Sequence, residues 1–193
     1  MDFDSRAIAQ AFPARLGAAA RANAPAWERF VQRSYRSHRF EVQVEGECLS
    51  IPQRIHLPGY QPPTALDVET RAMGWCLLTR STDGFERYYA LEQIVTANRS
   101  WTIPFVVALI GEYVIEILNL IEAALPGMDE AVVARFVAEN PAYLALTEAR
   151  VASYWNAYYR DRSTRRGYVG SRLIAALRDI ERKHRDAIGR DAP

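Results

Sequence analysis

The sequence predicts a mainly α-helical protein, either an antiparallel multi-helix bundle or a short α-solenoid-like array around a central helix. Three observations favour this fold class. The longest apolar segment has helical periodicity, helix start and end signals recur along the chain, and a single short segment alternates apolar with polar residues as a strand does. We therefore expect about seven or eight helices and one small N-terminal β-hairpin at about residues 39–56.

The central helix is predicted at about residues 103–125. Thr102 can cap its first N–H groups, and Pro104 suits the first turn, where a missing N–H costs nothing. Pro126-Gly127 then ends the helix. Apolar side chains cover nearly its whole circumference, so we expect neighbouring elements to bury it on most sides.

One narrow polar stripe interrupts this apolar surface. Glu112, Glu116 and Asn119 follow i, i+4 and i+7 spacing, which places them on one face of a continuous helix. The two acids also argue against a membrane span, because each charge inside a bilayer would cost roughly 2.5–3.5 kcal/mol.

The N-terminal region is expected to begin with short helices. Residues 4–22 are rich in alanine but interrupted at Phe12-Pro13, which predicts one broken helix or two short ones. Pro25 is expected to open a further helix. The apolar stripe of that helix consists of Trp27, Phe30, Val31, Ser34 and Tyr35.

The hydrophobic period then changes to that of a strand. Phe40, Val42 and Val44 alternate with polar residues, and Glu45-Gly46 offers a tight turn after them. The chain can then pair back on itself, which predicts the hairpin.

Helical periodicity returns after the hairpin and continues to the C-terminus. Asp83 and Glu86 have the spacing of a capping box, which marks one helix start clearly. Besides the central helix, the predicted helices are 64–80, 84–97, 129–139, 141–160 and 171–188, and an arginine-rich connection, residues 161–167, precedes the last one.

A chain of 193 residues suits a single domain that buries about 70% of its unfolded surface. Within this domain, 1–193, residues 1–57 hold the first helices and the hairpin, residues 58–63 form a Pro-rich loop, and residues 64–193 form the helical core. Its only two cysteines lie far apart, which is not a disulfide framework or a zinc knuckle. Together with an N-terminus unlike a secretory signal, they favour a cytoplasmic protein with no membrane partner.

Charge is segregated along the chain. Residues 1–57 carry 8 basic and 6 acidic side chains, residues 58–149 carry 5 and 12, and residues 150–193 carry 11 and 5. An acidic middle and a basic C-terminal part can attract each other within one fold or in a homo-oligomer. The basic residues are 23 Arg and one Lys, which favours a GC-rich bacterial genome as the source and identifies no partner.

The acidic stripe is one candidate site. Two carboxylates one turn apart on an apolar helix can share a proton or hold a ligand. The walls of such a ligand-binding pocket would come from Tyr113, Tyr154, Trp155 and Tyr158. The reading that we prefer is structural: the stripe is a solvent-facing edge, or it pairs with arginines such as Arg99, Arg150 or Arg172.

A block of aromatic and basic residues near the C-terminus is the second candidate. Tyr154, Trp155, Tyr158 and Tyr159 precede arginines that are candidate partner-binding residues, namely Arg160, Arg162, Arg165 and Arg166. Aromatic and arginine side chains can stack bases and neutralise phosphates. The acidic middle segment opposes nucleic-acid binding, however, so we prefer a core-facing aromatic stripe followed by a solvated arginine loop.

No catalytic, metal or cofactor site is predicted. Glu181 and His184 have the i, i+3 spacing of half a di-iron site, but a second such motif is absent. His38 and His56 have no ligand-spaced neighbours. The chain also lacks a nucleophile elbow and a Gly-rich phosphate loop.

These features favour a non-catalytic helical protein-interaction module, an adaptor, regulator or toxin-neutralising partner whose partner is another protein. The alternative is a small enzyme or ligand-binding protein that uses the acidic stripe, and the second alternative is nucleic-acid binding through the C-terminal block. An exposed patch rich in Tyr, Trp and Arg would favour the first function. A closed cavity with converging carboxylates would favour the enzyme or ligand-binding protein.

We expect the protein to fold without metal or disulfide bonds. Thermal melts with a chelator and with a reductant should match that of the untreated protein to within about 2 °C, which corresponds to less than about 1 kcal/mol for a chain of this size. A fall of about 10 °C with the chelator would instead indicate a metal site at Glu181 and His184.

Overall fold

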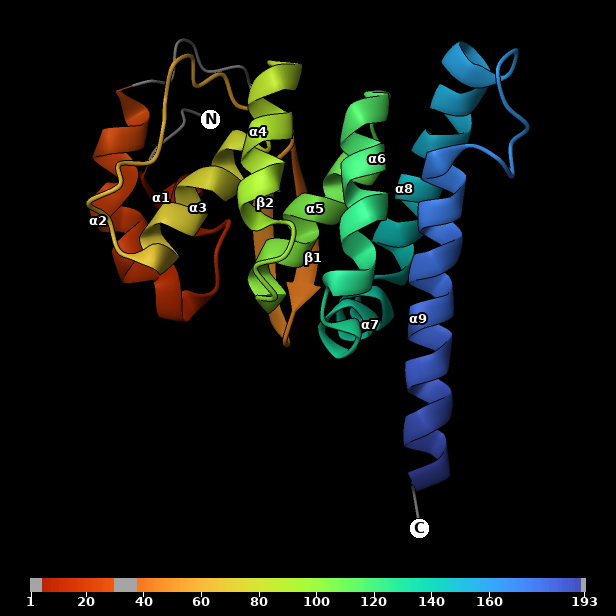
Figure 1. Cartoon of the computed structure of the whole chain (residues 1–193). Helices are drawn as coiled ribbons and strands as arrows, with labels where there is room; N and C mark the ends of the chain where they lie inside the picture. The colour runs from red at the N-terminus through yellow and green to blue at the C-terminus, as the bar shows by residue number, and fades with distance from the viewer. Residues whose placement is uncertain (1–4, 30–37, 192–193) are drawn as a thin grey trace. The chain divides into compact units, whose positions relative to one another are not determined.

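The computed structural model describes residues 5–29 and 38–191 and confirms the predicted fold class, a mainly α-helical chain with a small two-stranded hairpin (Figure 1). The chain divides into two compact units, Met1–Ile94 (unit 1) and Val95–Pro193 (unit 2). The expectation of a single domain stays a prediction. No helix in the described part of the chain is both long and apolar enough to cross a membrane.

Unit 1 combines short helices with the hairpin. Its elements are α1 (Ser5–Ala9), the 3-10 helix η1 (Ala14–Leu16), α2 (Gly17–Glu28), β1 (Arg39–Val44), β2 (Glu47–Pro52), α3 (Val68–Leu78) and α4 (Gly84–Ile94). The predicted break at Phe12-Pro13 is confirmed, since it separates α1 from η1. Asp83 caps α4 as predicted, because its Oδ1 accepts hydrogen bonds from the N–H groups of Phe85 (2.7 Å) and Glu86 (3.3 Å).

The prediction that Pro25 opens a helix is wrong, because Pro25 lies inside α2. The alanine-rich segment before it has high helix propensity, so the helix begins earlier, at Gly17. Ala20, Ala24 and Trp27 form the buried stripe of α2. The remaining residues of the predicted stripe, 30–35, lie outside the described residues.

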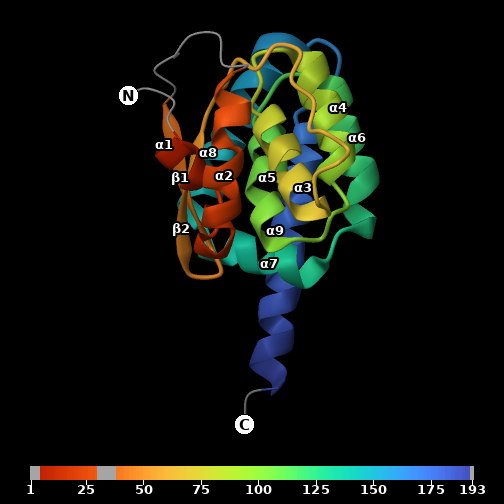
Figure 2. The same cartoon turned by 90° about the vertical axis from the view of Figure 1, so that its left-hand side faces the viewer.

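The two strands of the hairpin pair in the register that places their alternating apolar side chains on one face. Phe40 pairs with Ile51 and Val42 with Leu49, and these four side chains are buried on one face. The connecting turn has positive φ at Glu45 (53°) and Gly46 (80°), which matches the twist of the two strands. The hairpin lies beside α1 and α2 (Figure 2), and the Arg39 guanidinium donates to the Ala7 carbonyl at 2.7 Å.

The Pro-rich loop is anchored in the core of unit 1. Tyr60 is buried, and its hydroxyl accepts a hydrogen bond from Nε1 of Trp27 at 2.6 Å. Burial raises the pKa of Tyr60 to about 12, although the Trp27 hydrogen bond partly opposes this shift. On α3, a β-carbon at Gly74 would lie 2.8 Å from both Pro62 Cγ and the Tyr60 hydroxyl oxygen. Glycine at position 74 therefore allows the loop to pack directly against α3.

The described secondary structure of unit 2 consists of helices. Its elements are η2 (Ser100–Thr102), α5 (Ile103–Ile110), α6 (Ile115–Ala124), η3 (Leu125–Gly127), α7 (Glu130–Glu139), α8 (Pro141–Tyr154), the π-helical turn η4 (Trp155–Tyr159) and α9 (Val169–Asp191). Asp129 caps α7, and its Oδ1 accepts from the N–H groups of Ala131 (2.9 Å) and Val132 (3.2 Å).

The predicted central helix is two helices. α5 ends at Ile110, the chain leaves helical geometry between Gly111 and Val114, and α6 begins at Ile115. Gly111 has low helix propensity, and Val114 adopts an extended conformation with ψ of 107°. The two helices are also buried differently: every residue of α5 is buried, whereas α6 buries Ile117, Leu118 and Ile121 on one face.

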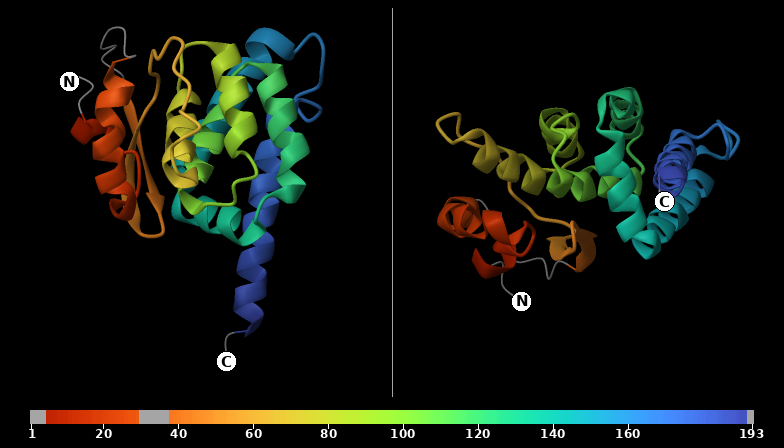
Figure 3. Two further views of the ribbon diagram at one scale, coloured as in Figure 1. Left: turned by 60° about the vertical axis from the view of Figure 1, so that its left-hand side comes forward. Right: turned by 90° about the horizontal axis from the view of Figure 1, so that it is seen from below.

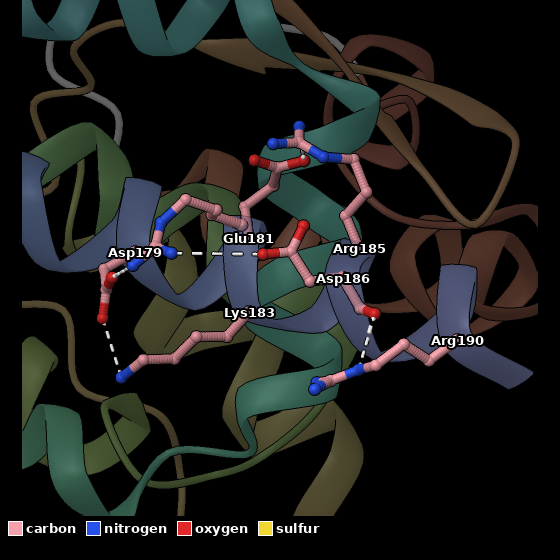
Figure 4. Close-up of polar contacts among 7 residues, drawn as sticks. Asp179, Glu181, Lys183, Arg185, Asp186 and Arg190 are labelled. Atoms are coloured by element: carbon pink, nitrogen blue, oxygen red, sulfur yellow. Dashed lines mark hydrogen bonds and ion pairs between the residues drawn. The ribbon is translucent and has the colours of Figure 1, made fainter.

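Helix α9 packs against α6, α7 and α8 over its first half and then extends past them (Figure 1). The extending part is stabilised by ion pairs along its own surface (Figure 4). Lys183 Nζ lies 2.7 Å from Asp179 Oδ2, and Arg185 Nη1 lies 2.8 Å from Glu181 Oε1. Hydrogen bonds from Lys183 and Arg182 lower the pKa of Asp179. Ile188 is 59% exposed near the end of this helix.

We expect Gly74→Ala to destabilise the protein although alanine favours helices. The added methyl group must displace Pro62 or Tyr60, at a cost of about 1–3 kcal/mol, which exceeds a propensity gain of about 1 kcal/mol. Urea unfolding of the variant and the wild type measures the difference. Gly189→Ala in α9 is the matched control, because open space surrounds that position. Its stability should hold or rise, and equal behaviour of the two variants would contradict the close loop packing.

Candidate functional site

The acidic stripe does not form one face in the structure. Glu112 lies in the break between α5 and α6 and is only 3% exposed, whereas Glu116 and Asn119 lie on α6 and are exposed. The stripe was derived from the periodicity of a continuous helix, and the break at 111–114 removes that periodicity. The prediction that both carboxylates occupy the same surface is therefore wrong.

Arg172, one of the arginines expected to pair with the acidic stripe, pairs instead with Glu122, which is not part of the stripe. Nε and Nη2 of Arg172 on α9 each donate to a carboxylate oxygen of Glu122 on α6, both at 2.7 Å. The hydrogen bonds lower the pKa of Glu122 and raise that of Arg172. This two-point contact ties α9 to α6.

Three of the four predicted pocket-wall residues meet in a tyrosine cluster, which we define as Tyr113, Tyr154 and Tyr158. The Tyr113 ring centroid lies 5.6 Å from that of Tyr154 and 5.5 Å from that of Tyr158, and the Tyr154 and Tyr158 rings stack at 6.1 Å. Tyr113 is 48% exposed and Tyr158 is 58% exposed. The cluster is therefore a surface and not the lining of a closed pocket.

The fourth residue, Trp155, has a different role. Its Nε1 donates to the Ser163 carbonyl at 3.0 Å, so it fixes the arginine-rich connection that follows. Trp155 begins the five-residue π-helical turn, where the sequence predicted a continuous α-helix to residue 160. π-Helical turns are rare in proteins, and those that do occur are often found at functional sites.

The two consecutive tyrosines at the end of this turn contact different rings. Tyr158 belongs to the tyrosine cluster, whereas Tyr159 stacks on Tyr168 with a centroid distance of 5.0 Å. The Tyr159 hydroxyl also donates to the backbone carbonyl of Tyr113 at 2.6 Å. This bond ties the π turn to the break between α5 and α6.

Burial and nearby charged groups both shift the pKa values of Tyr159 and Tyr168. Tyr168 is only 2% exposed, and its hydroxyl makes no hydrogen bond to any described residue. Burial raises its pKa to about 12, with a smaller contribution from Tyr159. Burial also raises the pKa of Tyr159, and the negative charge of Glu116 adds to this shift while Arg162 opposes it. Glu116 and Arg162 thus lie near enough to Tyr159 for their charges to act on its hydroxyl.

Arg160 and the arginine-rich connection that follows it present their charges to solvent. Arg160, Arg162, Arg165 and Arg166 are all exposed. Arg160 lies 3.7 Å from its exposed neighbour Asp161. Within the described residues, no carboxylate lies within ion-pair distance of Arg162, Arg165 or Arg166. An exposed, positively charged segment therefore follows the tyrosine cluster directly in sequence.

Unit 1 carries an exposed aromatic patch that the sequence did not reveal. Phe85 on the first turn of α4 is 89% exposed, and Tyr89 one turn later is 48% exposed. The Tyr89 ring contacts Trp75 of α3 edge to face, with centroids 5.4 Å apart. Helical periodicity cannot distinguish an apolar face that is covered from one that is not.

Among residues 5–29 and 38–191, no group of three or more His, Cys, Asp and Glu side chains is placed to hold a metal ion. Glu181 pairs with Arg185 on the outside of α9. Cys48 is exposed and Cys76 is buried.

No family model matches this chain, and comparisons with curated proteins and with solved structures found no match.

We expect Tyr168→Phe to reduce the loss of stability at high pH. An unfolded tyrosine ionises near pH 10, and the folded-state pKa of Tyr168 is about 12. The free energy of unfolding that this pKa shift contributes is present below pH 10 and is lost as pH rises through 12. Phenylalanine has no hydroxyl to ionise, so the variant does not undergo this part of the decrease in stability. At pH 8 the variant should be as stable as wild type or more stable, because a buried hydroxyl without a partner costs about 1–3 kcal/mol.

Denaturant unfolding at pH 8 and between pH 10 and 12 measures both effects. Tyr158→Phe is the control, because its hydroxyl is exposed, and it should change stability by no more than about 0.5 kcal/mol at either pH. If Tyr168→Phe instead lost stability at pH 8, the buried hydroxyl would have a partner in solution.

Proposed function

We propose that the protein is a non-catalytic interaction module that binds another protein through a tyrosine–arginine surface. This surface consists of the tyrosine cluster together with Arg160 and Arg162. The observation that carries the proposal is the mutual contact of the Tyr113, Tyr154 and Tyr158 rings, two of them exposed, followed directly in sequence by the exposed Arg160 and Arg162. Tyrosine and arginine are the residue types, with tryptophan, that contribute most to binding energy in protein interfaces.

The surface is held in place before any partner binds. The three rings contact one another, and the hydrogen bond from the Tyr159 hydroxyl to the Tyr113 carbonyl fixes the backbone beneath them. Side chains that are already ordered lose little conformational entropy on association, which favours affinity. We propose that this module acts in a bacterial cytoplasm, as an adaptor, regulator or toxin-neutralising partner, and that it can include a second copy of the chain among its partners.

The alternative of an enzyme or ligand-binding protein that uses the acidic stripe has less support. It needs carboxylates that converge on one cavity, but Glu112 is buried and Glu116 is exposed on a different helical segment. Nucleic-acid binding is the second candidate function, because stacked tyrosines beside arginines also suit unpaired bases and phosphates. Glu116, near Tyr159, adds a negative charge that disfavours a polyanion at this surface.

Site-specific photo-cross-linking tests the proposal. We expect the full chain with p-benzoylphenylalanine in place of Tyr158 to form a protein adduct on irradiation in its host cell, identified by mass spectrometry. Adding Tyr113→Ala and Arg162→Ala should reduce the adduct by about tenfold or more, as expected for loss of central interface residues. The same photoreactive residue in place of Ser153, an exposed position on α8, is the control and should give no adduct.

Equal labelling from positions 158 and 153 would contradict a specific interface. RNA as the cross-linked species would favour the second candidate function, especially if binding to single-stranded RNA at about 150 mM salt disappeared after Arg162, Arg165 and Arg166 were changed to Ala.

A further inference from the structure

A cavity of about 500 Å³ lies in unit 2 between α8, the arginine-rich connection and the first turns of α9. Figure 3 shows α8 and α9 side by side with the connection at one end of both. Val151 of α8 and Ile174 of α9 form an apolar floor, and Arg165 and Arg166 belong to the wall that the connection supplies. The cavity contains no residue of the tyrosine cluster.

Close packing of α9 on α8 forms one end of this floor. A β-carbon at Gly170 would lie 2.8 Å from the Tyr168 ring and 3.0 Å from Val151 Cγ1. Glycine in the first turn of α9 therefore lets the helix start directly against α8. The N-terminal end of α9, a helix of 23 residues, opens at the cavity, and Ser171 of its first turn belongs to the lining.

The charges around the cavity do not balance. Two of the charged lining residues already have partners: Arg172 holds Glu122 through two bonds of 2.7 Å, and Glu148 accepts from Arg178 at 2.6 Å. Arg165 and Arg166 have no carboxylate partner among the described residues. The positive end of the α9 dipole acts in the same direction. The cavity thus combines unbalanced positive charge with an apolar floor.

We propose that this cavity binds an organic anion, a molecule with one carboxylate, sulfonate or phosphate group on an apolar body. Arg165 and Arg166 bind the anionic group by charge-assisted hydrogen bonds, and the first turn of α9 faces it with its positive end. The apolar body packs on Ala152 and Ala175, which lie more exposed than the buried Val151 and Ile174 beneath them. A volume of about 500 Å³ is larger than a bare inorganic ion fills and is in the range of small-molecule sites. This site is independent of the protein interface proposed above.

Fluorescence titration of the full chain with 8-anilinonaphthalene-1-sulfonate tests the proposal, because this probe carries one sulfonate on an apolar aromatic body. We expect saturable binding of one probe per chain with a blue shift. Changing Arg165 and Arg166 together to Gln should weaken binding by at least about tenfold. The uncharged analogue N-phenyl-1-naphthylamine should bind the wild type at least about tenfold more weakly than the sulfonate.

Two matched variants separate charge from shape. Changing Arg160 and Arg162 together to Gln removes the same amount of charge from nearby positions that do not line the cavity, and should alter the affinity by no more than about twofold. Ala175→Trp fills the cavity at an exposed position without removing charge, and should abolish binding. Circular dichroism spectra and thermal melts of every variant check that each one folds.

Three outcomes would overturn the proposal. They are equal affinity of wild type and the Arg165/Arg166 variant, equal affinity for the charged and uncharged probes, and undiminished binding by a folded Ala175→Trp variant. Loss of binding in a Tyr113→Ala, Tyr158→Ala double variant would also overturn it, since the probe would then occupy the tyrosine cluster. None of these outcomes bears on whether a partner protein cross-links at position 158.

Discussion

The end of helix α5 at Ile110 is the constraint on which the arrangement of unit 2 depends. α5 is apolar on every side and fully buried, whereas α6 has one apolar face. If α5 continued as one straight helix, the segment that follows would also be buried on every side, although it includes Glu116 and Asn119. The chain therefore leaves the helix at Gly111, which lies beside α8: a β-carbon there would make ordinary van der Waals contacts with Arg150 (3.4 Å) and Thr147 (3.5 Å).

This break also creates the candidate surface. A carbonyl inside an α-helix is already bonded to the residue four positions later, but Tyr113 lies outside helical geometry and its carbonyl accepts the Tyr159 hydroxyl. The Tyr113 ring can then reach Tyr154 and Tyr158. The hydrogen bond and the ring contacts thus join the break between α5 and α6 to the π turn at the end of α8. Interface residues held by such contacts need little reorganisation to bind.

Around α9, the distribution of ion pairs decides which charges are available to other molecules. The pairs Arg172–Glu122 and Arg178–Glu148 are partly exposed, so each contributes little to stability, but they orient α9 against α6 and α8. They also neutralise Glu122 and Glu148. The connection itself keeps an excess of positive charge: Arg165 and Arg166 belong to the wall of the cavity, and the charge of Arg162 acts on Tyr159.

The sequence by itself determined the hairpin and the start of α4. The hairpin follows from strict alternation and from a Glu45-Gly46 turn with positive φ, and the start of α4 follows from Asp83, because these signals act between residues a few positions apart. Only the tertiary structure decided where α5 ends. In the sequence, Ile110, Val114, Ile117 and Ile121 are spaced as on one face of a continuous helix, so their pattern does not reveal the break. The tertiary structure also decided that Tyr113 meets Tyr158 and that Arg165 lines a cavity floored by Val151. These contacts join residues distant in sequence, and a periodic pattern reports which face of an element is apolar but not what covers it.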